Sequence, residues 1–177
     1  SIEADFMADK QPSTLKILCL ATYRRISSYN WSTQLKFPRR LSELEKFTVR
    51  DPLEEKSLAE KIPLLCEILD DVSLKVRAQY ENYPYPRWIK AAKVLRPQTV
   101  GEYIKEKKLS IFHEYNYDID TPKILIAGCG TGQHSIEFAQ RFKNSEVFSI
   151  DLSRASLAYA KRKSEELGLK NISFMQA

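Results

Sequence analysis

Residues 123–134 read Lys-Ile-Leu-Ile-Ala-Gly-Cys-Gly-Thr-Gly-Gln-His, and this stretch decides the fold of the chain. The run from Ile124 to Ala127 is apolar and partly β-branched, which predicts a strand buried on both faces. Three glycines follow at alternate positions, and the apolar residues of 135–142 recur at the spacing of a helix. The stretch therefore predicts a strand, a tight glycine turn and a helix. Glycine suits the turn because it adopts unusual dihedral angles and lets a ligand approach the backbone.

The elements that follow continue this pattern. Residues 146–150 predict a second strand that ends at Asp151, and residues 172–175 predict a third. Between these strands, Ser153 caps a helix that ends at Gly168. The buried side of this helix is marked by Leu157, Ala160 and Leu167. The order of strands and helices predicts an α/β fold with right-handed crossovers and a parallel sheet.

Asp151 stands about 20 residues after the glycine turn, where an acidic residue accepts hydrogen bonds from both hydroxyls of a ribose. A carboxylate suits this role because its oxygens only accept hydrogen bonds.

The spacing of the glycines indicates which kind of nucleotide ligand fits the turn. In the dinucleotide pattern G-x-G-x-x-G the third glycine stands where this chain has Gln133, and Gln133 and His134 crowd the place of a pyrophosphate. The form G-x-G-x-G fits a ligand without a pyrophosphate, such as S-adenosylmethionine.

Two parts of the sequence carry a family resemblance: "ILIAGCGTGQHSIEFAQRF" with "VFSIDLSRASLAYAKRK" in 124–163, and "VRAQYENYPYPRW" at 76–88. The first part resembles class I S-adenosylmethionine-dependent methyltransferases. With the second, the chain is similar to bacterial methyltransferases that carry tetratricopeptide repeats before the catalytic domain. The resemblance covers roughly residues 50–177. It implies S-adenosyl-L-methionine as the cofactor and the first half of a Rossmann-like parallel sheet, in a chain that is truncated at both ends.

The resemblance also implies a set of cofactor-binding residues: Ala127, Gly128, Cys129, Gly130, Thr131, Gly132, Gln133, His134, Asp151 and Leu152. In this family the glycines line the methionine part of the cofactor, Asp151 holds the ribose hydroxyls and Leu152 packs on the adenine. Many class I enzymes have Asp or Glu directly before the first glycine, whereas this chain has Ala127. Catalytic residues stay unknown, because the substrate-contacting strands are expected beyond Ala177.

The chain before the sheet divides by composition. Residues 1–78 predict a helical arm or cap, residues 79–122 predict a Tyr/Pro-rich strap, a helix and a linker, and residues 123–177 form the cofactor-binding part. Helices are expected at 14–29, at 41–47, from Asp51 with Pro52 in its first position, at 64–69 after Pro63, at 71–81, and from a capping box of Thr99 and Glu102. No repeat of about 34 residues is visible in 1–120, so tetratricopeptide repeats are expected upstream.

The strap segment, 80–88, has the most unusual composition of the chain. It holds Tyr80, Tyr83, Tyr85 and Trp88 together with two prolines at alternate positions. The prolines exclude a helix and hold the residues before them in an extended conformation. Two interpretations stay open. The segment is either a structural strap that buries its rings, or a lid in which Tyr83, Tyr85 or Arg87 faces the cofactor.

The charge and the cysteine content limit the possible classes of function. The formal net charge is +5, which gives a mild preference for an anionic partner. The three cysteines have no metal-binding spacing, so we expect no metal site and a reducing, cytoplasmic location. No apolar run has the length of a membrane span, and the sequence shows no signal-peptide pattern. Cys129 is interpreted as a small buried side chain in a turn, and not as a nucleophile.

The leading hypothesis is S-adenosylmethionine-dependent methyl transfer to an acceptor that is a protein, a nucleic acid or a small molecule. One alternative is a cofactor-binding or protein-interaction module without turnover, in which upstream repeats bind a protein partner. A further alternative is a nicotinamide-dependent dehydrogenase, which Gln133 disfavours. The sequence gives no indication of the oligomeric state.

Overall fold

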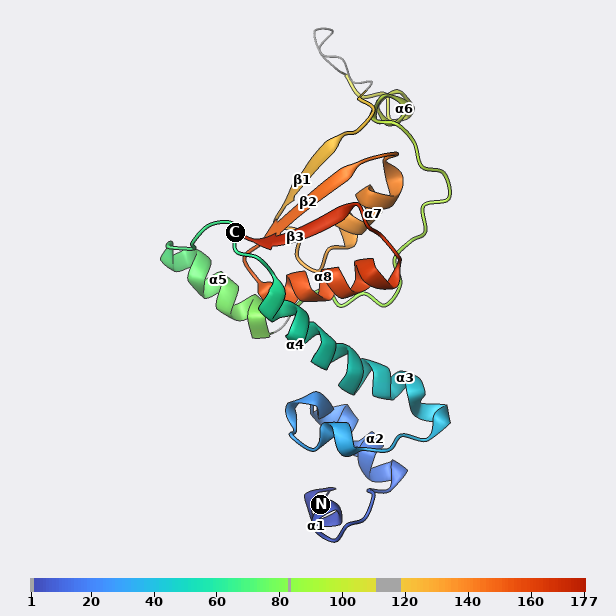
Figure 1. Cartoon of the computed structure of the whole chain (residues 1–177), viewed down its shortest axis with the longest axis vertical. Coiled ribbons are helices and arrows are strands. Elements are labelled where there is room, and N and C mark those ends of the chain that lie inside the picture. The colour runs from blue at the N-terminus through green and yellow to red at the C-terminus, as the bar shows by residue number, and fades with distance from the viewer. Residues whose placement is uncertain (1, 83, 111–118) are drawn as a thin grey trace. The chain divides into compact units, whose positions relative to one another are not determined.

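The computed structural model describes residues 2–82, 84–110 and 119–177 (Figure 1). The linker expected before the sheet falls partly outside these ranges. The chain divides into two compact units, Ser1–Ser57 and Leu58–Ala177. The α-helices are α1 Ile2–Met7, α2 Thr14–Tyr23, α3 Ser42–Glu45, α4 Asp51–Lys61, α5 Asp71–Asn82, α6 Val100–Glu106, α7 Gln133–Arg141 and α8 Arg154–Glu166. The strands are β1 Lys123–Ala127, β2 Glu146–Asp151 and β3 Ile172–Gln176.

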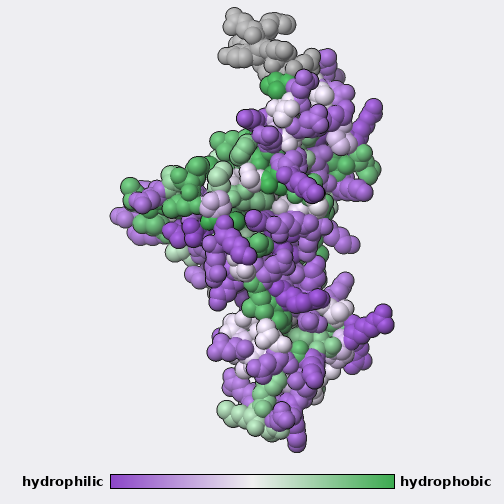
Figure 2. Space-filling view, viewed as in Figure 1, coloured by the Kyte–Doolittle hydropathy of each residue, from purple (hydrophilic) through white to green (hydrophobic). Residues whose placement is uncertain are grey.

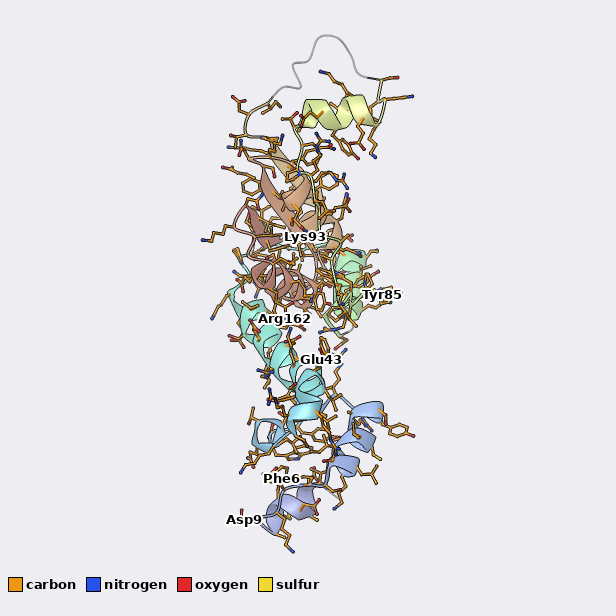
Figure 3. The ribbon with its side chains drawn as sticks, turned by 90° about the vertical axis from the view of Figure 1, so that its right-hand side faces the viewer. Phe6, Asp9, Glu43, Tyr85, Lys93 and Arg162 are labelled. Atoms are coloured by element: carbon orange, nitrogen blue, oxygen red, sulfur yellow. The ribbon has the colours of Figure 1, made fainter. Side chains whose placement is uncertain are left out.

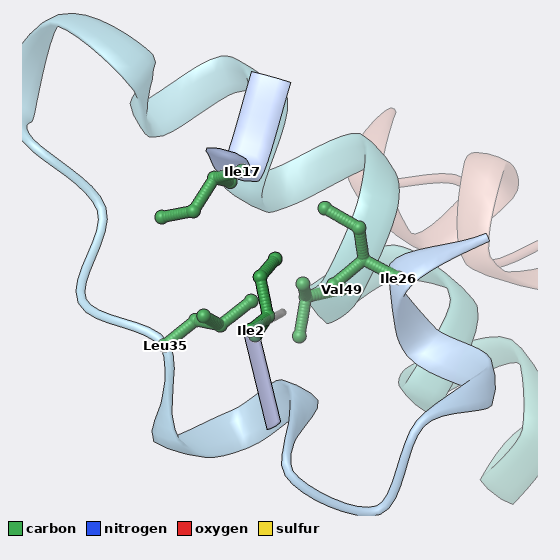
Figure 4. Packing of buried hydrophobic residues seen from close by; sticks show 5 residues of the cluster. All are labelled: Ile2, Ile17, Ile26, Leu35 and Val49. Atoms are coloured by element: carbon green, nitrogen blue, oxygen red, sulfur yellow. The ribbon is translucent and has the colours of Figure 1, made fainter. Parts of the chain in front are cut away.

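The first unit packs its helices around one hydrophobic cluster of buried residues, Ile2, Ile17, Ile26, Leu35 and Val49 (Figure 4). The helix expected over 14–29 is wrong in its last part, because α2 ends at Tyr23 and Arg24 is extended, with φ −141° and ψ 148°. A short 3₁₀ helix then begins at Ile26. In an unbroken helix Ile17 and Ile26 would lie on opposite faces. The break in the helix therefore brings both side chains into one core.

The helical run from α3 to α4 contains a π-turn, Lys46–Arg50. The helix start expected at Asp51 is wrong, because Asp51 has helical dihedral angles, φ −57° and ψ −47°, and continues the run. For the same reason the helix expected at 41–47 does not end there. In a regular α-helix Pro52 would crowd the carbonyl one turn earlier and leave it without an N–H partner. The wider π-turn just before Pro52 gives the proline ring the space that it needs.

The second unit is built on a parallel sheet in the order β1-β2-β3 (Figure 1). Lys123 pairs with Glu146 and Val147 pairs with Ile172, so the carboxyl ends of the strands lie at one edge of the sheet. Helices α7 and α8 pack against the sheet and against each other. The expected α/β fold with a three-stranded parallel sheet is therefore confirmed.

One face of the sheet is covered by α7 and α8, and it buries apolar side chains from each strand: Ile126, Val147 and Phe174. The prediction that the first strand is buried on both faces is wrong, because Leu125 is 65% exposed. Side chains alternate along a strand, and both helices cover the side opposite Leu125. The expected burial of Leu167 is also wrong. Leu167 follows the end of α8 as its C-cap residue, directly before the left-handed Gly168, and is 46% exposed.

A short backbone bridge replaces the helix expected at 64–69, which is therefore wrong. The carbonyl of Pro63 accepts from the N–H of Gln176 at 2.8 Å, and the N–H of Leu65 donates to the carbonyl of Gln176 at 2.8 Å. This parallel bridge joins the segment to the end of β3. A residue before proline prefers an extended conformation. Ile62 is such a residue and packs in the core beside α8 and β3, so burial and proline geometry both oppose a helix here.

Two expected helix starts are confirmed. Helix α5 begins at Asp71 and ends at Asn82. Helix α6 follows Thr99, whose Oγ1 accepts from the N–H of Glu102 at 3.1 Å while Glu102 Oε2 accepts from the N–H of Thr99 at 2.7 Å. This is the expected capping box, and it satisfies backbone donors at the start of α6.

Apolar side chains, Val72 among them, gather at the surface over α5 (Figure 2).

Candidate functional site

The turn after β1 is left-handed at each of its glycines, with φ +66° at Gly128, +54° at Gly130 and +75° at Gly132. A Cβ added at Gly128 or Gly130 would meet no heavy atom within 4 Å, so the backbone there borders open space. A Cβ added at Gly132 would lie 2.4 Å from the Cβ of Ala160 on α8. The first two glycines therefore expose backbone to a ligand, whereas the third allows α8 to pack closely.

The carboxylate of Asp151 is held at the mouth of this turn. Its Oδ2 accepts from the N–H of Gly130 at 2.8 Å, and its Oδ1 accepts from the N–H of Ser153 at 2.9 Å. A carboxylate offers about four acceptor positions, so two stay available after these bonds are made. The side chain therefore braces the turn and can still accept hydrogen bonds from two hydroxyl groups.

A cavity of about 790 Å³ lies at this edge of the sheet. Its size is within the usual range of small-molecule sites. Every residue of the cofactor-binding set implied by the sequence lines this cavity, except Gly132. The structure thus brings together Ala127, Gly128, Cys129, Gly130, Thr131, Gln133, His134, Asp151 and Leu152.

Other residues of the cavity lining were not predicted from the sequence: Val76, Tyr80, Pro86, Glu137, Ile150, Ser156 and Ala177. Glu137 stands one helical turn after Gln133 on α7, so helical spacing could have identified it. Val76 and Tyr80 are also one turn apart and present one face of α5 to the cavity. No local signal could have placed them there, because only the tertiary fold brings α5 to the glycine turn.

The three lid candidates of the strap have different positions. Tyr85 lines the cavity and is 76% exposed (labelled in Figure 3). The guanidinium of Arg87 lies 4.6 Å from the ring centre of Tyr159, outside the cavity lining. Tyr83 lies outside the described residues. Tyr85 is therefore the described lid candidate that borders the cavity.

Hydrogen bonds fasten the strap to the glycine turn and to α8. The Oγ1 of Thr131 donates to the carbonyl of Pro86 at 2.7 Å, and the indole Nε1 of Trp88 donates to the carbonyl of Thr131 at 3.1 Å. The hydroxyl of Tyr159 donates to the carbonyl of Trp88. Because the side chain of Trp88 is buried in the same cluster as Tyr159, this part of the segment packs as a structural strap.

Glu81, at the end of α5, caps the start of α8. Its Oε1 accepts from the N–H of Arg154 at 2.7 Å, and its Oε2 accepts from the N–H of Ala155 at 3.1 Å. The Oγ of Ser153 accepts from the N–H of Ser156 at 3.1 Å. These bonds satisfy N–H groups that a helix start leaves without intrahelical partners. They also fix the cavity-lining α5 to the loop that follows Asp151.

The surroundings of Cys129 differ from those of a reactive cysteine. Burial raises the pKa of the Cys129 thiol to about 12, and the negative charge of Asp151 adds to this increase. The thiol therefore stays protonated near neutral pH, which supports a structural side chain and opposes a nucleophile. His134 lines the cavity and packs edge-on against Phe138, with ring centres 4.3 Å apart.

Within residues 2–82, 84–110 and 119–177, no group of three or more His, Cys, Asp or Glu residues is placed to hold a metal ion. The helices described there include none with both the length and the apolar character needed to cross a lipid bilayer. The cysteines Cys19, Cys66 and Cys129 are free thiols.

Known proteins resemble parts of this chain. The family model described as a methyltransferase domain matches residues 120–177. Two uncharacterized proteins of Rickettsia prowazekii (strain Madrid E) are 30% identical over 95 residues and 32% identical over 54 residues. These matches cover 54% and 30% of this chain but only 15% and 22% of the relatives, so the chain spans a small part of their length. The crystal structure of a SAM-dependent methyltransferase from Aquifex aeolicus aligns with a TM-score of 0.32 and 16% identity, over 63% of this chain and 48% of that one. Residues 120–177 are therefore similar in sequence to a methyltransferase domain.

Proposed function

We propose that this chain binds S-adenosyl-L-methionine at the glycine turn and belongs to an enzyme that transfers its methyl group to an acceptor. The observation that carries the proposal is the 2.8 Å hydrogen bond from the N–H of Gly130 to Oδ2 of Asp151. It holds a carboxylate suited to ribose hydroxyls beside backbone that is open to a ligand. The match of residues 120–177 to a methyltransferase domain supports the same chemistry.

The residues around the cavity fit this cofactor. Asp151 has acceptor positions for the ribose hydroxyls, and the open space at Gly128 and Gly130 accommodates the methionine part. Leu152 offers an apolar side chain to the adenine. Among the described residues, the acidic side chains that line the cavity are Glu137 and Asp151, and no Lys or Arg lines it. An acidic lining suits a ligand with a sulfonium and an ammonium group and disfavours a pyrophosphate.

When bound, the cofactor supplies a methyl group that its sulfonium has already activated. The task of this chain is then to orient the adenosyl and methionine parts, so that an acceptor meets the methyl group in line, and to keep water away. The turn and Asp151 fix the orientation. Tyr80 and Tyr85 border the cavity with aromatic side chains, and we propose that Tyr85 closes over the bound cofactor.

We further propose a longer parent protein in which tetratricopeptide repeats precede this chain and bind a protein partner. The sequence run at 76–88 supports this subtype. The free thiols support a cytoplasmic location. Residues 1–78 would serve as a helical arm, 79–122 as strap, helix and linker, and 123–177 as the cofactor-binding half. The acceptor is a protein, a nucleic acid or a small molecule, and methylation assays on each class decide among them.

The test is calorimetric titration of the chain with S-adenosylmethionine, S-adenosylhomocysteine and NAD. We expect binding of the first two ligands and none of NAD. The Asp151→Ala variant should weaken binding by about 1.5–3 kcal/mol, or roughly 10- to 150-fold, because hydrogen bonds to a charged group are lost. Asp120→Ala, which removes an exposed carboxylate outside the cavity, is the matched control and should bind like the wild type.

Three results would change the proposed function or its site. Binding of NAD alone would replace the methyl donor with a nicotinamide cofactor. Binding of S-adenosylmethionine without transfer of labelled methyl to any component of a cell extract, tested on the full parent protein, would support a binding module without turnover. Unchanged affinity in Asp151→Ala would remove Asp151 from the site.

A further inference from the structure

We propose that the carboxylate of Glu137 binds the ammonium group of the cofactor's methionine part. This inference rests on the proposed function and assigns a subsite within the same cavity. Glu137 lines the cavity from α7, and its side chain is 43% exposed, so a ligand can reach it. The end of β1 has Ala127 and offers no carboxylate of its own.

The geometry of α7 directs Glu137 toward the glycine turn. The helix starts at Gln133, directly after Gly132, and Gln133 and His134 line the cavity together with Glu137. Residues four apart lie on the same side of a helix, with a rise of about 6 Å between them. Helical side chains lean toward the N-terminus of their helix. The Glu137 side chain therefore starts on the side of α7 where Gln133 faces the cavity.

The charges around the cavity leave this role to Glu137. In the described part of the chain, Asp151 is the other acidic side chain of the lining, and it already accepts from two backbone N–H groups. Its remaining acceptor positions suit the ribose hydroxyls. An ammonium group at the opposite end of the ligand lies away from Asp151, because the adenosyl and amino-acid ends extend in different directions from the sulfur, and a second carboxylate there adds a charge-assisted hydrogen bond.

Arg141, one helical turn further along α7, binds the carboxylate of Glu137. Its Nη2 donates to Oε1 of Glu137 at 2.6 Å, in an i,i+4 pair on α7. A carboxylate has two oxygens, so it can bind a guanidinium through one and an ammonium group through the other. The pair also limits the rotamers of Glu137, which reduces the entropy lost when the ligand binds.

The experiment compares two ligands that differ at the amino-acid end. S-adenosylhomocysteine carries the ammonium group, whereas methylthioadenosine keeps the adenosine and the sulfur but lacks the amino-acid part. Titration calorimetry at pH 7.5 measures both ligands on the wild type and on Glu137→Gln. We expect Glu137→Gln to weaken S-adenosylhomocysteine about 5- to 30-fold and to leave methylthioadenosine within twofold. Glu146→Gln, an exposed glutamate outside the cavity, is the matched control and should change neither affinity.

Each outcome separates the two proposals. Equal affinity of the wild type and Glu137→Gln for S-adenosylhomocysteine would overturn the inference and leave the proposed function standing. An equal loss for both ligands would overturn it too, because Glu137 would then support the fold of the site and not the ammonium group. Failure of the wild type to bind either ligand would overturn the proposed function itself.

Discussion

Replacement of Gly132 by alanine tests whether the glycine turn is shaped by the packing of α8. Gly132 has φ +75°, and an added Cβ would lie 2.4 Å from the Cβ and 3.3 Å from the Cα of Ala160. The ring of Phe174 is 3.5 Å from the same point. Real Cβ atoms do not approach each other this closely, and the Ala160 atoms cannot move without moving α8. The variant must therefore shift the turn or the helix.

Two costs add in this variant. A left-handed conformation costs an L-residue about 1–2 kcal/mol. Overpacking in a close-packed core costs about 1–3 kcal/mol more. We expect Gly132→Ala to lower the free energy of unfolding by about 2–5 kcal/mol. Gly168→Ala is the matched control, because Gly168 has a similar φ of +69° but no heavy atom within 4 Å of its added Cβ. This control should show only the first cost, about 1–2 kcal/mol.

Urea unfolding followed by tryptophan fluorescence measures both variants. The chain has two tryptophans, and a Trp31→Phe background leaves Trp88 as the reporter of the second unit. Adding Ala160→Gly to Gly132→Ala removes the colliding Cβ, so a double-mutant cycle should show a coupling of about 1 kcal/mol or more. If Gly132→Ala loses no more stability than Gly168→Ala, and the cycle shows no coupling, the packing argument for this glycine is refuted.

The other predictions concern the thiols and the cap of α8. At pH 8 a thiol with a pKa of about 12 is ionised to about one part in ten thousand, so iodoacetamide should label Cys129 at least about 100-fold more slowly than the exposed Cys66. Peptide mass spectrometry measures both rates, and equal rates would contradict the raised pKa of Cys129. Glu81→Ala removes the acceptor of two N–H groups of α8 and should lower the free energy of unfolding, measured in urea, by about 1–2 kcal/mol. The control Glu67→Ala replaces an exposed glutamate and should change this free energy by less than about 0.5 kcal/mol. Equal losses in the two variants would mean that the cap contributes nothing specific.

The strand, glycine turn and helix at 123–142 could be predicted because their signals are local. Apolar and β-branched residues, alternate glycines and helical spacing each act within a few residues. The capping box at Thr99 is local in the same sense. The position of Asp151 was also predictable, since parallel strands in register bring the end of β2 beside the turn that follows β1.

The misplaced elements depend on contacts between distant residues. Ile26 leaves the helical path of α2 because the core of the first unit needs its side chain. Segment 62–65 pairs with β3, and apolar composition alone gave no sign of this bridge. Leu125 is exposed because both helices lie on the opposite face of the sheet, which the strand's own sequence does not encode. Tertiary contacts decided each of these positions against the local pattern.

The position of the glycine that packs against a helix distinguishes this turn from the turn of a dinucleotide-binding site. In the dinucleotide pattern the third glycine of G-x-G-x-x-G allows close packing between helix and strand. In this chain Gly132, one position earlier, has that role through its contact with Ala160. The shift leaves Gln133 as the first residue of α7, with its side chain and that of His134 in the cavity lining. A pyrophosphate at this helix start would therefore meet two side chains, and Glu137 one turn later would repel it. A ligand whose cationic end approaches α7 meets the same three residues as binding partners.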